Sequence, residues 1–264
     1  ILMCYPYICV ALRKSKIDKN YNVAKIREKD PNARVGFGTF IRLFAVAEAF
    51  GIMGSTLGQI VDDAVKGYFN VEGGESGLDE LVQFDTYGDI IVTVLCIVII
   101  APILEEFIFR KTLIDAMEGY DQRAAVLISA VIFGFFHGNF EQMFYCIGIG
   151  LVSGYMYART KKLRYSIYMH MAFNGYSILI AMMMSKLEAQ GIDLESKDSV
   201  ALFSELSNFE LTSLTVLGLL IIFIYVLAIS GFVLLLKKGR LAYNSLGKGI
   251  APTTKSEIRL GLTS

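Results

Sequence analysis

Two adjacent glutamates, Glu105 and Glu106, directly follow fifteen uncharged residues (90–104), and Arg110 lies four residues after Glu106. Ionisable side chains attached to an apolar run of membrane-spanning length are costly and usually functional. Neighbouring residues on a helix point about 100° apart, so the two glutamates cannot share one proton and we expect them to have separate roles. Glu106 and Arg110, spaced i,i+4, can pair on one helical face. Glu105 is then left to act as a general base.

The only two histidines of the chain, His137 and His170, also lie in apolar segments. His170 precedes Asn174 by four residues, so an imidazole and an amide share one helical face. Such a pair can donate two hydrogen bonds to a developing oxyanion. A structural interpretation stays open. In that interpretation the glutamates line a polar seam, His137 is a structural hydrogen-bonding residue, and His170 with Asn174 clamps two helices.

Water is the expected nucleophile, because no serine or cysteine is well placed beside a histidine. It would be activated either by Glu105 as a base or by a metal ion. Zinc held by Glu105, His137 and His170 is chemically possible. The metal-free arrangement fits Asn174 better, because asparagine is a poor zinc ligand and a natural oxyanion donor. We therefore expect no cofactor, with zinc as the alternative.

The composition is that of a membrane protein. Hydrophobic residues make up 54% of the 264 residues, and the mean hydropathy is +0.52, whereas soluble domains are about 45–50% apolar. The net charge is zero and no basic block suggests nucleic acid. The four cysteines lie in apolar stretches without a CxxC pair, which argues against a disulfide framework or a zinc finger. The chain starts at Ile1 rather than Met, so we expect the amino terminus to be trimmed and any earlier helix to be out of view.

The apolar segments predict an all-α, polytopic transmembrane helical bundle with about seven spans, or eight if a further helix precedes Ile1. Small residues such as Gly148 predict close helix packing, and Pro102 should kink its helix or loosen the hydrogen bonding before Glu105. Glu48, in the second segment, could pair with Arg110 or line a polar cavity. We expect one membrane-embedded domain over residues 1–264, with a motif-bearing core at 88–185 and a flexible cytoplasmic tail at 237–264. The seven segments are 1–12, 35–61, 90–117, 124–140, 142–158, 165–185 and 211–236.

Loop charges predict the orientation of the chain. The segments 13–34 and 159–164 and the tail are basic, whereas the loops 62–89 and 186–210 are acidic. These signs alternate as successive crossings require. By the positive-inside rule the basic segments are cytoplasmic, which predicts a multi-pass protein of the cell membrane.

Three motifs in order resemble those of the CAAX protease and bacteriocin-processing family (CPBP, or Abi), which includes the type II CAAX prenyl endopeptidases. They are Glu105-Glu106-x-x-x-Arg110, Phe133-x-x-x-His137 and His170-x-x-x-Asn174. The resemblance covers roughly residues 88–185. It implies a helical membrane fold with an active site in a cavity open towards the cytosol. It also implies that Glu105 with His137 activates a water, that His170 and Asn174 hold the oxyanion, and that Glu106 and Arg110 support the site.

The leading hypothesis is therefore an intramembrane endopeptidase that hydrolyses a peptide bond of a lipidated or hydrophobic peptide. A prenylated CAAX protein, a bacteriocin leader and a peptide pheromone are all compatible substrates. The competing hypothesis is a non-catalytic membrane scaffold or bacteriocin-immunity protein of the same fold. A weaker third is a transporter that uses the buried charges for proton coupling.

Overall fold

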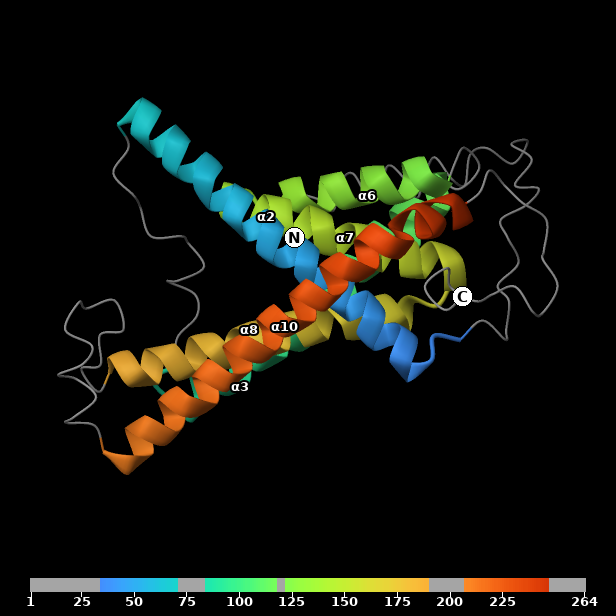
Figure 1. The fold of residues 1–264 in the computed structure, drawn as a ribbon. Coiled ribbons are helices and arrows are strands. Elements are labelled where there is room, and N and C mark those ends of the chain that lie inside the picture. The colour runs from blue at the N-terminus through green and yellow to red at the C-terminus, as the bar shows by residue number, and fades with distance from the viewer. Residues whose placement is uncertain (1–33, 71–83, 118–121, 190–206, 247–264) are drawn as a thin grey trace.

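The computed structural model describes residues 34–70, 84–117, 122–189 and 207–246, and these contain helices and no strand (Figure 1). The separate helices are α2 (Phe37–Phe69), α6 (Gln122–Phe136), α7 (Phe140–Thr160), α8 (Leu163–Glu188) and α10 (Asn208–Ser245). Between α2 and α6 runs one continuous helical segment, Tyr87–Met117, whose winding changes along its length. The all-α prediction holds for every described residue.

Four of the described helical segments are long and apolar enough to cross a membrane: α2, Tyr87–Met117, α8 and Phe209–Ala242 of α10. They correspond to four of the predicted spans. α6 has 15 residues, which at 1.5 Å per residue is about 22 Å and less than the roughly 30 Å of a bilayer core. As described, α6 is shorter than a crossing helix, so the predicted span 124–140 stays a prediction. α7 is not among the four candidates, and the predicted segment 1–12 lies outside the described residues, so a count of seven spans stays a prediction.

The ends of the helices alternate between the two ends of the bundle. The right side of Figure 1 holds the first residues of α2 and α8 and the last residues of α7 and α10. The left side holds the last residues of α2 and α8 and the first residues of α10. This arrangement places the helix ends that flank the two acidic segments at one end of the bundle, as the charge pattern requires. Which end faces the cytoplasm stays a prediction.

Two boundaries differ from those expected. α2 continues into the predicted loop 62–89, where Lys66 pairs with Asp62 at 2.6 Å across one helical turn. α10 continues through the basic residues at 237–240 and ends at Ser245, so the first part of the predicted flexible tail is helical. Charges ended both apolar runs in the sequence, but charged side chains spaced along a helix do not interrupt it.

The helical segment Tyr87–Met117 contains two π-helical stretches, and a short α-helical stretch lies between them. Its parts are α3 (Tyr87–Thr93), η2 (Val94–Ile100), α4 (Ala101–Glu106), η3 (Phe107–Ile114) and α5 (Asp115–Met117), of which η2 and η3 are π-helical. The backbone N–H of Ala101 donates to the carbonyl of Cys96, five residues back. In that register the carbonyl of Ile97 would receive the N–H of residue 102, but Pro102 has none. The predicted loosening of the hydrogen bonding before Glu105 is confirmed.

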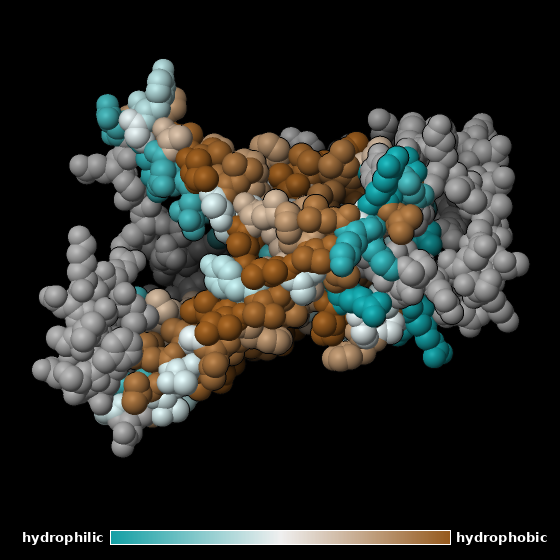
Figure 2. Space-filling view, in the orientation of Figure 1, coloured by the Kyte–Doolittle hydropathy of each residue, from teal (hydrophilic) through white to brown (hydrophobic). Residues whose placement is uncertain are grey.

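α7 is the central helix, packed along α2 and α6, and α10 crosses α2. Glycines permit the close approach. A Cβ on Gly148 of α7 would lie 2.5 Å from the Cβ of Phe50 on α2, and one on Gly54 of α2 would lie 2.5 Å from the backbone of Tyr145 on α7. The close packing predicted at Gly148 is confirmed. Figure 2 shows hydrophobic side chains over the middle of the visible face and hydrophilic ones gathered towards the helix ends.

Candidate active site

Glu106 and Arg110 form a fully buried ion pair within one helix. The Nε atom of Arg110 donates to Oε2 of Glu106 at 3.0 Å, and neither residue is exposed to solvent. The guanidinium also lies 4.8 Å from the centre of the Phe133 ring. The predicted i,i+4 pair is confirmed. Because a buried charge that loses its partner is strongly destabilising, this pair holds α4 and η3 in a fixed arrangement.

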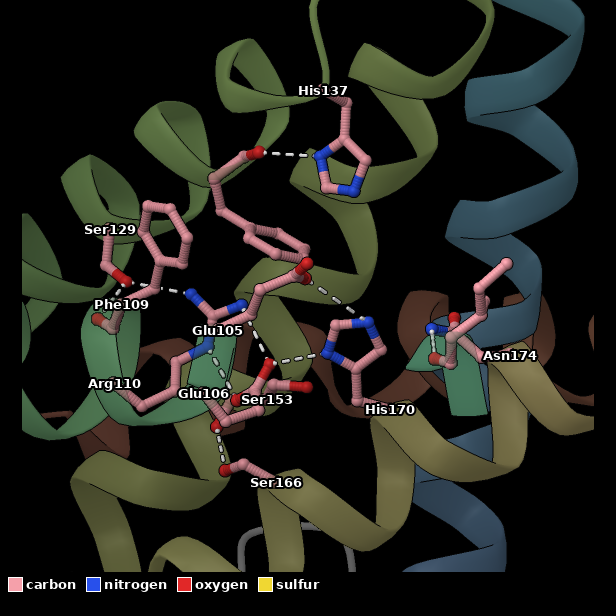
Figure 3. A network of polar contacts seen from close by, with 12 residues as sticks. Glu105, Glu106, Phe109, Arg110, Ser129, His137, Ser153, Ser166, His170 and Asn174 are labelled. Atoms are coloured by element: carbon pink, nitrogen blue, oxygen red, sulfur yellow. Dashed lines mark hydrogen bonds and ion pairs between the residues drawn. The ribbon is translucent and has the colours of Figure 1, made fainter. Parts of the chain in front are cut away.

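Ser129 on α6 is a member of this cluster that sequence reasoning missed. Its hydroxyl accepts a hydrogen bond from Nη1 of Arg110 at 2.8 Å and donates one to the carbonyl of Phe109 at 2.7 Å (Figure 3). The carbonyl belongs to η3, where the wide winding frees backbone groups for side-chain partners. No sequence signal could have found this contact, because an uncharged serine in an apolar helix is common.

His170 on α8 lies between the two glutamates (Figure 3). Its Nδ1 is 3.1 Å from Oε1 of Glu106, and its Nε2 is 3.7 Å from Oε2 of Glu105. A carboxylate accepts, so Nδ1 donates to Glu106 and the orientation of the ring is fixed. The distance of 3.7 Å is too long for a hydrogen bond, which leaves Nε2 and the Glu105 carboxylate available to a third group. From the sequence we assigned Glu106 to Arg110 and missed that it also binds His170.

His137 lies in the turn between α6 and α7, at the end of α6 rather than inside a helix as expected. Its Nδ1 is 2.9 Å from the carbonyl oxygen of Phe133. A carbonyl oxygen only accepts hydrogen bonds, so Nδ1 carries the proton and Nε2 keeps the lone pair in the neutral ring. The Phe133 ring lies edge-on to both histidine rings, at centroid distances of 4.9 Å to His137 and 5.6 Å to His170.

The turn itself explains where α6 stops. Gly138 has φ +73°, a left-handed conformation that residues with a side chain rarely adopt. Asn139 then caps α7 by accepting the N–H of Gln142 at 2.7 Å. The role of Gly138 is thus to turn the chain, whereas Gly134 is the glycine of this region that packs against α7.

Asn174 on α8 donates a hydrogen bond to the Ile97 carbonyl, which Pro102 leaves without a backbone partner. Its Nδ2 donates to the oxygen of Ile97 at 2.9 Å (Figure 3). Neighbouring side chains commonly satisfy backbone groups that a proline frees in a membrane helix. Asn174 thus links α8 to the neighbouring helix, as in the structural interpretation of this residue. One hydrogen of the amide is used in this hydrogen bond, and the other remains available.

Glu105, His137, His170 and Asn174 all line one cavity of about 700 Å³. Polar residues on α2 extend this lining from Glu48 through Ser55, Thr56 and Gln59. On α2 this direction leads towards Phe69, away from the end of the bundle that carries the basic 159–164 connection. If that connection is cytoplasmic, the polar lining on α2 extends away from the cytosol. A cavity open towards the cytosol, which the resemblance implies, stays a prediction. Of the two roles left open for Glu48, the structure supports cavity lining.

The three donors of the alternative zinc site do not converge. Among the residues that the structure describes, no group of three or more His, Cys, Asp or Glu side chains is arranged to hold a metal ion. Nδ1 of His170 is engaged by Glu106 and Nδ1 of His137 by a backbone carbonyl, which leaves Nε2 as the free nitrogen of each ring. Metal-binding histidines commonly have such an Nδ1 partner, so these two hydrogen bonds do not decide between the mechanisms. The metal-free mechanism remains a prediction.

Comparisons with known proteins agree with the motifs. Residues 87–176 match the family model described as "Type II CAAX prenyl endopeptidase Rce1-like". The chain is 36% identical over 83 residues to "Putative membrane peptidase YdiL" of Bacillus subtilis, which covers 31% of this chain and 34% of that protein. It is 32% identical over 92 residues to "Membrane-embedded CAAX protease MroQ" of Staphylococcus aureus, which covers 32% of this chain and 37% of that protein.

The matched part therefore spans about a third of each of these two relatives. No solved structure matches the chain significantly. The resemblance inferred from the three motifs is confirmed for residues 87–176, which contain all seven motif residues from Glu105 to Asn174.

Proposed function

Starting from the similarity of residues 87–176 to type II CAAX prenyl endopeptidases, we propose that this chain is an intramembrane endopeptidase. It hydrolyses a peptide bond of a lipidated or hydrophobic peptide. One observation carries the proposal: Glu105, His137, His170 and Asn174, which come from two helices and the turn after α6, line one cavity in an apolar bundle. Polar groups gathered in a membrane-embedded cavity are functional by default.

In the proposed reaction a water molecule binds between the carboxylate of Glu105 and Nε2 of His137. Glu105 takes a proton from this water as the hydroxide attacks the carbonyl carbon of the scissile bond. The resulting tetrahedral intermediate carries its negative charge on the former carbonyl oxygen. When the C–N bond breaks, the proton held by Glu105 passes to the leaving nitrogen, so the carboxylate is regenerated and the products are an acid and an amine.

In this proposal the oxyanion is stabilised by the free amide hydrogen of Asn174 and by Nε2–H of His170. Because Nδ1 of His170 already donates to Glu106, this role requires His170 to carry a proton on both ring nitrogens. A single such donor is worth roughly 10²–10³ in rate in characterised hydrolases. Support comes from the fixed positions of both side chains, one held by Glu106 at 3.1 Å and the other by the Ile97 carbonyl at 2.9 Å. Donors that are already oriented need no reorganisation during the reaction. Glu106, Arg110 and Ser129 act as positioning residues because they reach the substrate only through His170 and the helix backbone.

A prenylated CAAX protein, a bacteriocin leader and a peptide pheromone remain the substrate candidates, and the name of the S. aureus relative refers to a CAAX protease. The proposal requires that the substrate reach a cavity within the membrane. A non-catalytic scaffold or bacteriocin-immunity protein of the same fold needs no intact base. The full set of motif residues around the cavity supports the enzyme over the scaffold.

Comparison of new peptide termini tests the proposal and requires no identified substrate. Cells that express the chain and cells that express its Glu105→Gln form are matched for protein level. Mass spectrometry then compares the peptide termini in membranes and medium. We expect at least one membrane-associated peptide to be cleaved only by the unmodified chain. Identical sets of termini in the two strains would favour the scaffold.

A further inference from the structure

Glu48 on α2 is a second buried carboxylate at the candidate active site that no motif includes. It is only 1% exposed. Its Oε2 accepts a hydrogen bond from the hydroxyl of Tyr176 on α8 at 3.1 Å. Its other oxygen, Oε1, has no hydrogen-bond partner among the described residues. Glu48 and Tyr176 both line the cavity that contains Glu105 and His170.

Burying an ionised carboxylate in an apolar bundle costs free energy when one of its oxygens accepts no hydrogen bond and no cation compensates its charge. Arg110 is not its partner, since that guanidinium is bound by Glu106 and Ser129. Buried polar groups normally have partners, so an unsatisfied buried oxygen on a residue that lines a cavity indicates a group that arrives with a ligand. The Tyr176 hydroxyl fixes the carboxylate in place and leaves Oε1 for that group.

We propose that Glu48, held by Tyr176, is a substrate subsite for a positively charged group of the peptide, namely a lysine or arginine side chain or a free amino terminus. The identification of the ligand as a peptide depends on the proposed function. A cation is favoured over a neutral N–H donor, because only a cation compensates the full charge of the carboxylate. The polar lining of α2 at Ser55, Thr56 and Gln59 gives such a charged group a hydrated route to Glu48.

The position of the subsite in the chain bears on selectivity. α2 (Phe37–Phe69) lies outside residues 87–176, the range that matches the family model. The catalytic groups therefore come from the matched core, whereas the charge-selective group comes from a helix that the match does not cover. In this arrangement Glu48 selects which peptide is cut, and Glu105 acts on whichever carbonyl is placed beside it.

The test measures binding in a protein that cannot cut. The probes are fluorescent, amino-terminally acetylated hydrophobic peptides in which one lysine is moved along the sequence. Each has a partner in which norleucine, of similar length but uncharged, replaces the lysine. Binding to the Glu105→Gln protein in nanodiscs is followed by fluorescence anisotropy. We expect one lysine position at which the peptide binds at least about tenfold more tightly than its norleucine partner.

Substitutions in the same Glu105→Gln background assign this preference to the subsite. Glu48→Gln should abolish it, Glu48→Asp should retain part of it, and Tyr176→Phe should reduce it because the carboxylate is no longer held. Glu188→Gln and Tyr168→Phe are matched controls, since both residues lie exposed on α8, and both variants should keep the full preference.

Equal binding of the lysine and norleucine peptides at every position would overturn the proposal, as would a preference that survives Glu48→Gln. Thermal unfolding of each variant shows whether a loss of binding reflects a loss of structure, and retention of the preference by Glu48→Asp would exclude that explanation. The outcome is independent of catalysis. Lysine-selective binding by a protein whose unmodified form never cleaves a peptide would leave this subsite standing and remove the proposed function.

Discussion

The side-chain amide of Asn174 on α8 donates a hydrogen bond to the backbone carbonyl of Ile97, 2.9 Å away on the neighbouring helix. That carbonyl is free because Pro102, in the register of the π-helical turn, has no N–H to offer it. A proline in one helix thus fixes a side chain of the candidate active site in another. The same helix carries Glu105 three residues after the proline, so the position of Asn174 and the position of the proposed base depend on one backbone distortion.

A double-mutant cycle tests this coupling. Asn174→Ala alone leaves the Ile97 carbonyl buried without a partner, which should cost about 1–3 kcal/mol of unfolding free energy. In a Pro102→Ala background residue 102 can donate its own N–H, so the further loss of Asn174 should cost clearly less. Unfolding of the four purified proteins in detergent gives both values. Equal costs in the two backgrounds would mean that the proline does not free the carbonyl for Asn174.

Substitution of Glu106 and substitution of Glu105 should have different effects on the free energy of unfolding. Glu106→Gln leaves the buried Arg110 without its charged partner and should lower the unfolding free energy by about 3–5 kcal/mol. Ser129→Ala removes one neutral partner of the same guanidinium and should cost about 1–3 kcal/mol. Glu105→Gln should change stability little, since among the described residues the closest charged partner of Glu105 is His170, at 3.7 Å. A stable but inactive Glu106→Gln protein, beside an active Glu105→Gln protein, would require the two roles to be exchanged.

Membrane orientation can be tested with single cysteines in a background whose four native cysteines are replaced by serine. Cysteine at Arg164 should react with a membrane-impermeant maleimide only from the cytoplasmic side. Gln59 lines the cavity on the half of α2 that leads to Phe69, away from the end of the bundle that carries Arg164. Cysteine at this position should therefore react from outside. Reaction of the Arg164→Cys protein from outside intact cells would show that the predicted orientation is wrong. Reaction of the Gln59→Cys protein only from inside would support the cytosol-open cavity that the resemblance implies.

Metal dependence can be tested on the purified protein. A zinc site formed by Glu105, His137 and His170 would need its donors about 2.0–2.2 Å from one ion, whereas in the structure these side chains form no metal-holding group. We expect peptide cleavage to survive chelation and the protein to contain much less than one zinc per chain. One zinc per chain, with activity lost to a chelator and restored by zinc, would contradict the metal-free mechanism but not the protease.

The parts of the site that could be predicted from the sequence are those whose partners share a helix. The Glu106–Arg110 pair follows from spacing alone, because i,i+4 residues face each other once the segment is helical. His170 binding to Glu106 and Asn174 binding to Ile97 join residues 64 and 77 positions apart. Such contacts depend on how two helices pack, which a single sequence does not specify.

The fold shows the same limit. Apolar residues continue from 124 to 136, and nothing in that run indicates that the helix stops before His137. The stop comes from the left-handed Gly138 and the Asn139 cap, two weak local signals within a strongly apolar stretch. In the opposite direction, the charges at 62–66 suggested a loop, but α2 continues through them, with Asp62 and Lys66 paired one helical turn apart. Hydropathy locates apolar segments well and their ends poorly.

The central claim is that Glu105 activates the attacking water. The most direct measurement is the single-turnover cleavage rate of a peptide by the purified protein in nanodiscs, compared with that of its Glu105→Gln form. The amide keeps the size and most of the hydrogen bonding of the carboxylate, so peptide binding and unfolding temperature should be unchanged. General-base catalysis contributes about 10²–10⁴ in rate, and we predict a loss of at least that size with binding retained. A Glu105→Gln protein that binds and cleaves the peptide as fast as the unmodified chain would contradict this claim.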